Sequence, residues 1–344
     1  MFDLNPQQRA AVKYIDGPLL VLAGAGSGKT GVITRKIAYL IRDCEISPKH
    51  ITAVTFTNKA AREMKQRVSH ILGKDEVRGL IVSTFHNLGL RILSKEHKKL
   101  GYKAGFSIFD TTDTLTLLKG LYKQNNASNL DDAEELRWRI SKWKNDFIMP
   151  EQALLEAEHD IDARFARLYA HYQRQLKAYN AFDFDDLILQ PVLLFQQHRD
   201  ALESWQKRMH YLLVDEYQDT NASQYQLVKL LLGTHARLTA VGDDDQSVYS
   251  WRGARPENLE MLSQDYHRLK VIKLEQNYRS SSRILKCANH LISHNPHVFE
   301  KKLWSELGQG EPVRIIECSS AEAEAERVVV EINTHKFQNR TKNS

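Results

Sequence analysis

The sequence predicts an α/β fold: a parallel sheet into which a helical subdomain is inserted. Three observations lead to this prediction. Short apolar runs alternate with amphipathic helical patterns over the first 85 residues, a long charged stretch of helical character follows, and the apolar runs then return. Alternating strands and helices are typical of a parallel sheet. A sheet that is interrupted and then resumed indicates one α/β domain that carries an insertion.

The N-terminal part contains three strand-like runs separated by helical patterns. Leu19–Ala23 is apolar and ends in a glycine-rich turn, and a helical pattern follows over Lys29–Ile41. Ile51–Phe56 is the second β-rich run, and Lys59–Leu72 is helical with its charges on one face. Leu80–Phe85 is the third short run. This order predicts parallel strands joined by helical crossovers.

The middle of the chain, from about Asn87 to Gln196, is predicted to be helical. Strand-like runs are scarce there, and long charged stretches with helical periodicity dominate, such as Asp131–Asp146 and Ile161–Tyr179. Buried strands are then predicted again at Tyr211–Asp215, Arg237–Val241 and Val271–Leu274.

The C-terminal part begins a new unit at Tyr278. Arg314–Glu317 is a predicted strand and Ala321–Thr334 a predicted helix, and so few elements do not bury a core by themselves. We therefore predict three parts. Residues 1–86 and 197–277 form the sheet domain, residues 87–196 form the helical insertion, and residues 278–344 are the incomplete start of a second domain.

The charge of the chain is unevenly distributed. The 344 residues include 48 Lys and Arg against 43 Asp and Glu, a net charge of +5. Residues 31–100 contain 14 basic and 6 acidic residues, a net charge of +8. A polyanionic partner fits this charge. The solvated faces of basic helices explain it equally well.

Several classes of protein are excluded by composition. No apolar run approaches the ~20 residues of a membrane helix, and the N-terminus lacks a basic start followed by an apolar stretch, so we expect neither a membrane partner nor a signal peptide. The three cysteines are far apart and form no CxxC, which argues against a disulfide framework and a zinc site. We predict a cytoplasmic location.

The segment after the first strand has the pattern of a phosphate-binding loop. It lies between a predicted strand and a predicted helix, which is the context that such a loop requires. Glycines let successive N–H groups point at phosphate oxygens, and the start of the helix adds its positive end. The lysine reaches the β- and γ-phosphates, and the threonine offers its hydroxyl to Mg²⁺. The residues are Ala23, Gly24, Ala25, Gly26, Ser27, Gly28, Lys29 and Thr30.

Two acids end a later strand. Leu212–Val214 is followed by Asp215 and Glu216. Beside a phosphate loop, the first acid binds Mg²⁺ and the second polarises the attacking water. An apolar run that ends in acids is common, but in combination with the phosphate loop it predicts hydrolysis of a nucleoside triphosphate.

A series of motifs resembles those of superfamily 1 DNA helicases of the UvrD/Rep type. They occur in the order found in that family and cover essentially the whole chain. The resemblance implies a RecA-like P-loop NTPase sheet with a helical insertion, followed by the start of a second RecA-like domain. The motifs are LNPQQ (Leu4–Gln8), AGAGSGKT (Ala23–Thr30), AVTFTNKAAREM (Ala53–Met64), STFH (Ser83–His86), FDFDDL (Phe182–Leu187), VDEYQDT (Val214–Thr220), VGDDDQSVYSWRGA (Val241–Ala254) and LEQNYRS (Leu274–Ser280).

The resemblance also implies nucleotide contacts. Gln8 corresponds to a residue that recognises adenine, and its amide matches the N6 donor and N7 acceptor of that base. On sequence alone a polar helix start is the better explanation of Gln8. Tyr278 resembles a residue that stacks on the base, Gln246 one that senses the γ-phosphate, and Arg279 one that neutralises charge in the transition state. A surface ion pair is the alternative for Arg279.

Aromatic residues at strand ends are the predicted DNA contacts. Phe56, Tyr249 and Trp251 follow predicted strands, and rings at such places can stack on the bases of single-stranded DNA. Core packing is the alternative for Phe56. Arg252 is expected to bind phosphate or to link the DNA and ATP sites.

Two further sequence features are candidate DNA contacts. Thr84 and His86 are expected to contact the DNA backbone, although a structural histidine explains His86 equally well. Arg137–Lys144 (RWRISKWK) could touch duplex DNA, but a half-buried amphipathic helix is the better explanation.

The expected function is that of an ATP-dependent 3′–5′ DNA helicase that uses ATP and Mg²⁺. The expected partners are single-stranded DNA and single-strand–duplex junctions, with self-association or replication and repair proteins as further partners. Members of the family continue beyond the motifs found here, so we expect this chain to be inactive in unwinding by itself. The alternatives are a nucleotide- and DNA-binding module without unwinding activity, part of a RecB- or AddA-like helicase–nuclease subunit, and a P-loop ATPase with a protein substrate.

Overall fold

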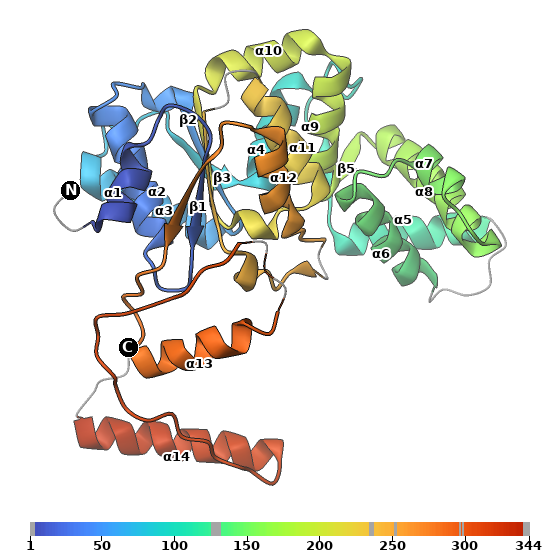
Figure 1. Ribbon diagram of the computed structural model, residues 1–344. Coiled ribbons are helices and arrows are strands. Elements are labelled where there is room, and N and C mark those ends of the chain that lie inside the picture. The colour runs from blue at the N-terminus through green and yellow to red at the C-terminus, as the bar shows by residue number, and fades with distance from the viewer. Residues whose placement is uncertain are drawn as a thin grey trace.

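Six strands form the central sheet of the computed structural model, and every pairing between neighbours is parallel (Figure 1). The structure describes residues 4–124, 132–233, 237–250, 253–295, 297 and 299–339. In spatial order the strands are β3 (Ile81–Thr84), β2 (Ile51–Thr55), β6 (Tyr211–Val214), β7 (Leu238–Gly242), β1 (Leu19–Ala23) and β8 (Lys270–Leu274).

The predicted strands of the sheet are confirmed, each with its ends shifted by at most a residue or two. Their spatial order differs from their order in the chain, because β6 and β7 lie between β2 and β1. The carboxyl ends of β1, β6 and β7 are therefore neighbours. In parallel sheets ligands bind beyond these ends.

Helices cover both faces of the sheet. Successive strand residues point to opposite faces, so that Leu20 and Leu22 enter one core while Leu19 and Val21 enter the other. One face is covered by α1 (Pro6–Lys13), α2 (Lys29–Arg42) and α3 (Asn58–Leu72). The other is covered by α4 (Phe85–Glu96), α9 (Asp186–Gln197), α10 (Arg199–Arg208), α11 (Ala222–Leu232) and α12 (Glu257–Asp265).

The inserted segment has a hydrophobic core of its own, which includes Tyr122, Leu136, Tyr169 and Tyr172. The predicted helix Ile161–Tyr179 is confirmed as α8, and the described part of Asp131–Asp146 as α6. The segment contains α5 (Thr111–Gln124), α6 (Asp132–Asn145), α7 (Pro150–Leu155) and α8 (Asp160–Ala178), with a parallel strand pair β4 (Ser107–Phe109) and β5 (Ala181–Asp183).

Helices α4 and α9 lie mostly within residues 87–196 but pack on the central sheet. Phe85, Leu88 and Ile92 of α4 and Ile188 and Val192 of α9 belong to the same core as the strands. The predicted division of the chain into three parts stays a prediction, and these contacts place both helices with the sheet.

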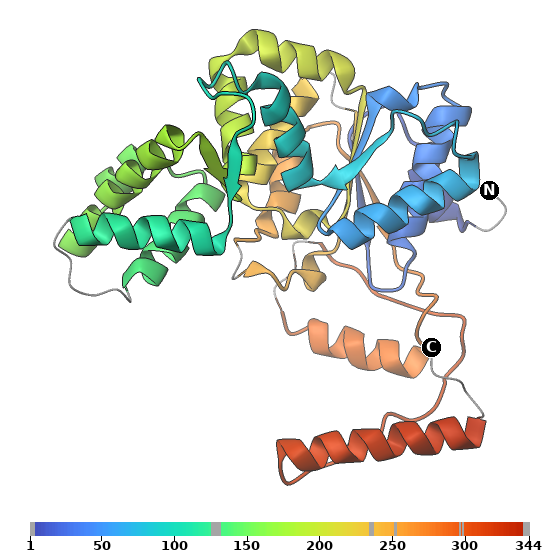
Figure 2. The same cartoon turned by 180° about the vertical axis from the view of Figure 1, so that it is seen from behind.

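The C-terminal part contains α13 (Ser282–Ile292) and α14 (Ala321–Asn339), which lie apart from the sheet (Figures 1 and 2). The predicted helix at Ala321–Thr334 is confirmed. The predicted strand at Arg314–Glu317 is wrong: these residues pair with no described strand, and Ile315 is 95% exposed. A β-rich run without a neighbouring strand has no partner for its backbone hydrogen bonds.

Three short 3₁₀ helices complete the described structure: η1 (Pro48–His50), η2 (Tyr217–Asp219) and η4 (Asp244–Gln246). Across the described ranges, every helix is too short or too polar to cross a lipid bilayer.

Candidate functional site

The predicted phosphate loop connects β1 to α2. Gly26 and Gly28 have φ angles of +70° and +87°, a left-handed conformation that glycine adopts without steric cost. The Ser27 hydroxyl donates a hydrogen bond of 2.7 Å to the carbonyl of Gly24, which closes the turn. Gly28 caps α2 without a side-chain hydrogen bond, so no capping side chain occupies the first N–H groups of the helix. This arrangement suits an anion such as phosphate.

Lys29 connects the loop to the two acidic segments that follow β6 and β7. Its Nζ donates to Glu216 Oε2 at 3.2 Å and to Gln246 Oε1 at 3.2 Å, and 12% of its side chain is exposed. Gln218 donates to Glu216 Oε2 at 2.9 Å and accepts from the backbone N–H of Asp243 at 3.0 Å. We call Lys29, Asp215, Glu216 and Gln246 the Lys29 cluster. Four predicted catalytic residues therefore lie together.

The carboxyl groups after β6 are held in an unfavourable environment. Burial, together with the charge of Glu216, raises the pKa of Asp215 to about 7, although Lys29 and a backbone N–H oppose the shift. Burial also raises the pKa of Asp219 to about 6, and its Oδ1 lacks a hydrogen-bond partner among the described residues. Glu216 has a φ of +50°, which costs a non-glycine residue roughly 1–3 kcal/mol.

These acids fit a divalent cation. Carboxylate and hydroxyl oxygens are the ligands that Mg²⁺ prefers, and Thr30 follows Lys29 in the first turn of α2. A cation beside Asp215 would favour the ionised carboxylate and offset its burial. Thr30 and Asp215 are thus the residues of this chain that fit the metal.

Gln8 braces the phosphate loop from α1. Its side-chain amide donates to the carbonyl of Ser27 at 2.8 Å and accepts from the backbone N–H of Asn5 at 3.1 Å. Asn5 in turn accepts from the backbone N–H of Gln8 at 2.7 Å, which completes a capping box at the start of α1. The polar helix start considered above is therefore present. Adenine recognition by Gln8 needs an exchange of these partners.

The segment after β8 also contacts the loop. Asn277 donates to the carbonyl of Ala25 at 2.6 Å, and the backbone N–H of Tyr278 donates to the carbonyl of Gly26 at 3.0 Å. The Tyr278 hydroxyl accepts from Asn5 at 2.9 Å, so this ring lies beside α1. The Cβ of Arg279 lies 2.8 Å from where a Cβ on Gly26 would be. The structure thus places both predicted residues at the loop.

Asn277 was not among the predicted site residues. Its Oδ1 accepts from the backbone N–H groups of Arg279 and Ser280 at 2.8 and 2.7 Å. An asparagine that bonds to the backbone two and three residues ahead is a recognised turn pattern, and this local signal could have identified it.

Phe56 and Tyr249 form a stacked pair. Their ring centroids are 5.1 Å apart and the rings are inclined by 19°. Phe56 is half-buried and belongs to none of the hydrophobic cores, so core packing does not account for it. The structure therefore brings two of the predicted DNA-contacting rings together. Trp251 and Arg252 lie outside the described residues.

Thr84 and His86 lie near this pair. The Thr84 hydroxyl caps α4 by accepting from the backbone N–H of Asn87 at 3.3 Å. His86 contacts the ring of Phe184 edge-on at 6.4 Å, and burial lowers its pKa. Burial therefore favours the neutral form of His86, which can donate or accept a hydrogen bond.

A hollow of about 740 Å³ separates the aromatic pair from the inserted helices. Phe56 and His86 line one side, and Arg137, Trp138 and Lys142 of α6 line the other. Leu136 and Ile140 of the same helix are buried in the core of the insertion, whereas Trp138 is 52% exposed. The helix is half-buried and amphipathic, as the sequence favoured, and its exposed face borders the hollow.

A buried lysine in the insertion was missed by the sequence analysis. Nζ of Lys144 lies 2.6 Å from Asp183 and 2.9 Å from Asp186, and Tyr172 donates to Asp183 at 2.8 Å. We call these four residues the Lys144 cluster. Both acids belong to the FDFDDL motif, but its lysine partner is distant in sequence.

The acids of the segment after β7 are also paired. Nζ of Lys301 lies 2.7 Å from Asp243 and 2.7 Å from Asp245, and it contacts Asp244 as well. Asp244, Asp245 and His297 could otherwise hold a metal ion. Because Lys301 already supplies a positive charge there, we assign no metal to this group.

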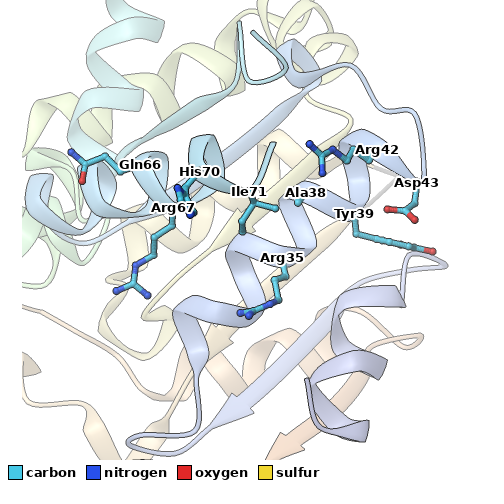
Figure 3. Close-up of a pocket in the computed structure, with 9 residues that line it drawn as sticks. All are labelled: Arg35, Ala38, Tyr39, Arg42, Asp43, Gln66, Arg67, His70 and Ile71. Carbon is cyan, nitrogen blue, oxygen red and sulfur yellow. The ribbon is translucent and has the colours of Figure 1, made fainter. Parts of the chain in front are cut away.

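Another hollow, of about 640 Å³, lies between α2 and α3 (Figure 3). Its lining includes Arg35, Arg42, Arg67 and His70. It contains none of the predicted site residues, so the chemistry is not expected there.

Two family models match the chain. The model described as the UvrD/REP helicase N-terminal domain matches residues 4–267, and the model described as the UvrD-like helicase C-terminal domain matches residues 272–344.

Curated relatives match nearly all of the chain. ATP-dependent DNA helicase Rep of Escherichia coli K12 is 59% identical over 338 residues, which are 98% of this chain and 50% of the relative. Rep of Buchnera aphidicola subsp. Schizaphis graminum is 47% identical over 96% of this chain and 50% of the relative. ATP-dependent DNA helicase PcrA of Staphylococcus epidermidis (strain RP62A) is 44% identical over 97% and 46%. The chain spans about half the length of the curated relatives it matches.

Proposed function

Because the chain belongs to the UvrD/Rep helicase family, we propose that it forms the ATP-hydrolysing and single-strand-binding part of an ATP-dependent 3′–5′ DNA helicase. The observation that carries the proposal is the convergence on Lys29. A phosphate loop, the acids after β6 and Gln246 after β7 meet at one lysine, next to a stacked aromatic pair. The 3′–5′ direction rests on the resemblance to the family.

ATP hydrolysis is assigned to the Lys29 cluster. Lys29 leaves Glu216 and Gln246 to bind the β- and γ-phosphates, for which the loop N–H groups form the cradle. Glu216 then orients the attacking water, and Gln246 contacts the γ-phosphate. Arg279 neutralises charge that develops in the transition state. Thr30 and Asp215 would hold Mg²⁺, which would supply further neutralisation of the phosphate oxygens.

The nucleoside is assigned to the pocket wall formed by α1 and the segment after β8. Tyr278 stacks on adenine with its partly exposed ring. Gln8 pairs with the base edge after it releases Asn5 or Ser27. Because Gln8 and Tyr278 both touch Asn5 or the phosphate loop, nucleotide binding changes the contacts that hold the loop.

DNA binding is assigned to the aromatic pair and the hollow beside it. Bases stack on Phe56 and Tyr249, with Trp251 as a third ring, and each stacked base contributes ~1–3 kcal/mol with little sequence preference. Thr84, His86 and Arg252 contact the backbone. The substrates are single-stranded DNA and its junctions with duplex.

The test measures ATP hydrolysis with and without single-stranded DNA for the wild-type chain, Lys29→Ala and the exposed control Lys13→Ala. We expect stimulation by DNA, and a loss of about 100- to 1000-fold in rate for Lys29→Ala alone, because a preorganised cationic donor is removed. Binding of ATP and DNA without turnover in the wild-type chain would support a binding module instead. A chain that binds neither would contradict the proposal.

A further inference from the structure

A basic groove follows the edge of the central sheet. It lies between α3 and α4, has a volume of about 1520 Å³, and includes Ile81, Val82 and Ser83 of β3 in its lining. β3 is an edge strand of the sheet, and Figure 2 shows it from the side where α3 and α4 flank it. The basic residues that line the groove are Lys49, Arg62, Lys65, Arg91, Lys95 and Arg208, and none of the lining residues is acidic.

Most of these cations form no ion pair within the described part of the chain. Lys95 lies 3.6 Å from Glu96 and over the ring of Trp205. The other five make no ion pair with any residue that the structure describes. All five are exposed. Unpaired charges of one sign along a groove concentrate the potential and attract a polyanion.

A buried hydroxyl gives a second, independent indication of a ligand. Ser83 lines the groove and is 6% exposed, and its Oγ has no hydrogen-bond partner among the described residues. Buried polar atoms are normally hydrogen-bonded, so an unpaired one calls for an explanation. A ligand atom in the groove would supply the missing partner.

One end of the groove meets the candidate DNA site. Asn58 and Asn87 line it there and are hydrogen-bonded to each other at 2.9 Å. Asn58 is two residues beyond Phe56, and the backbone N–H of Asn87 donates to Thr84. Lys49 and Arg208 line the groove at the amino ends of β2 and β6. The groove therefore runs along this edge of the sheet, from the carboxyl end of the strands beside the aromatic pair to their amino end.

We propose that this groove binds the sugar–phosphate backbone of single-stranded DNA that continues from the Phe56–Tyr249 pair. The inference rests on the proposed function. Trp205, the one aromatic ring other than His50 among the lining residues, is buried, so the groove offers cations without a surface for stacking. Contacts of this kind are independent of sequence and sensitive to salt.

The test compares three proteins. The groove variant combines Lys65→Gln, Arg91→Gln and Arg208→Gln. The control variant combines Lys13→Gln, Arg67→Gln and Arg237→Gln, which remove the same charge from residues outside the groove. Each protein is titrated with dT oligomers of about 4 and about 16 nucleotides, the range over which single-strand sites vary in size. The unfolding midpoints of all three are measured to show that they are folded.

We expect an effect on the long oligomer only. Each lost phosphate contact makes the slope of log affinity against log salt less steep by ~0.7, so three lost contacts reduce its steepness by ~2. When salt rises from 50 to 200 mM, the affinity of wild type for the long oligomer should therefore fall about 16-fold more than that of the groove variant. The short oligomer, held at the aromatic pair, should bind all three proteins alike.

Three results would overturn the proposal. The groove variant could keep the wild-type slope with the long oligomer, the control variant could lose the same slope, or the groove variant could lose affinity for a blunt duplex while single-strand binding is unchanged. Each would leave the proposed function intact if the short oligomer still binds. Failure of wild type to bind either oligomer would overturn both proposals.

Discussion

Lys144 and Lys29 each reach two groups on other segments of the chain, but at different distances. Nζ of Lys144 is fully buried, 2.6 and 2.9 Å from its carboxylates. Nζ of Lys29 lies 3.2 Å from Glu216 and from Gln246, with part of its side chain exposed. The Lys144 cluster joins α6 and α8 to β5 and α9, whereas the Lys29 cluster lies at the carboxyl edge of the sheet.

The two clusters differ most in their balance of charge. Burial lowers the pKa of Lys144, but the charges of Asp183 and Asp186 outweigh burial and raise it well above its usual value. In the Lys29 cluster, burial and Glu216 raise the pKa of Asp215 to about 7, and Lys29 offsets this only partly. The first cluster is satisfied by the protein itself. The second has more acid than its one cation balances, as expected of a site that receives a metal ion and a phosphate.

The largest effect on stability is expected at the Lys144 cluster. Lys144→Met leaves two carboxylates buried without their cation, which should lower the free energy of unfolding by ~3–5 kcal/mol. The exposed Lys142→Met on the same helix should change it by less than ~0.5 kcal/mol. Urea unfolding of both variants measures the difference. Equal effects would show that Lys144 is not an essential partner.

The Lys29 cluster should make the stability of the chain depend on pH. Asp215 has a pKa of about 7 in the folded chain against 3.8 as its ordinary value, so the folded state binds the proton more tightly. Stability should therefore fall as pH rises from about 4 to about 7, by at most ~4 kcal/mol. Asp215→Asn should flatten this dependence.

The measurement is urea unfolding at about pH 5 and about pH 7.5 in the presence of a metal chelator. Asp16→Asn, which changes an exposed aspartate, serves as the control. If Asp215→Asn and wild type lose stability in parallel, the carboxyl of Asp215 does not carry the predicted pKa.

The smallest effect is expected from backbone strain. Glu216 has a φ of +50°, so Glu216→Gly should stabilise the chain by ~1 kcal/mol while ATP hydrolysis is lost. Glu45 has a φ of +55° and is exposed, so Glu45→Gly should give the same gain without loss of activity. Thermal unfolding and ATPase assays compare the two. A stable and fully active Glu216→Gly would remove Glu216 from the catalytic residues.

The sequence predicted the elements of the fold better than their arrangement. Leu19–Ala23 and its five companion strands were recognisable because a buried strand in a parallel sheet is a short, continuously apolar run. The strand prediction failed at Arg314–Glu317, where two isoleucines favour a strand but no partner strand lies among the described residues. Composition indicates that a segment can form a strand, but strand pairing requires another strand to lie beside it.

The candidate site likewise has parts that the sequence predicts and parts that only the structure reveals. The phosphate loop and the Asp215–Glu216 pair are local patterns, so they could be recognised without coordinates. The role of Asn277 against Ala25, the pairing of Lys144 with Asp183, and the groove along β3 join segments that are distant in the chain. No local pattern encodes such contacts.

By itself the sequence determined the α/β class, the positions of the strands, the phosphate loop and the family to which the chain belongs. These follow from residue order, because hydrophobic periodicity and short motifs act over a few neighbouring residues. Only the tertiary structure decided that β6 and β7 lie between β2 and β1, that Lys29 rests on Glu216 and Gln246, and that unpaired cations line the sheet edge. These depend on which distant segments pack together, and packing is a property of the whole chain.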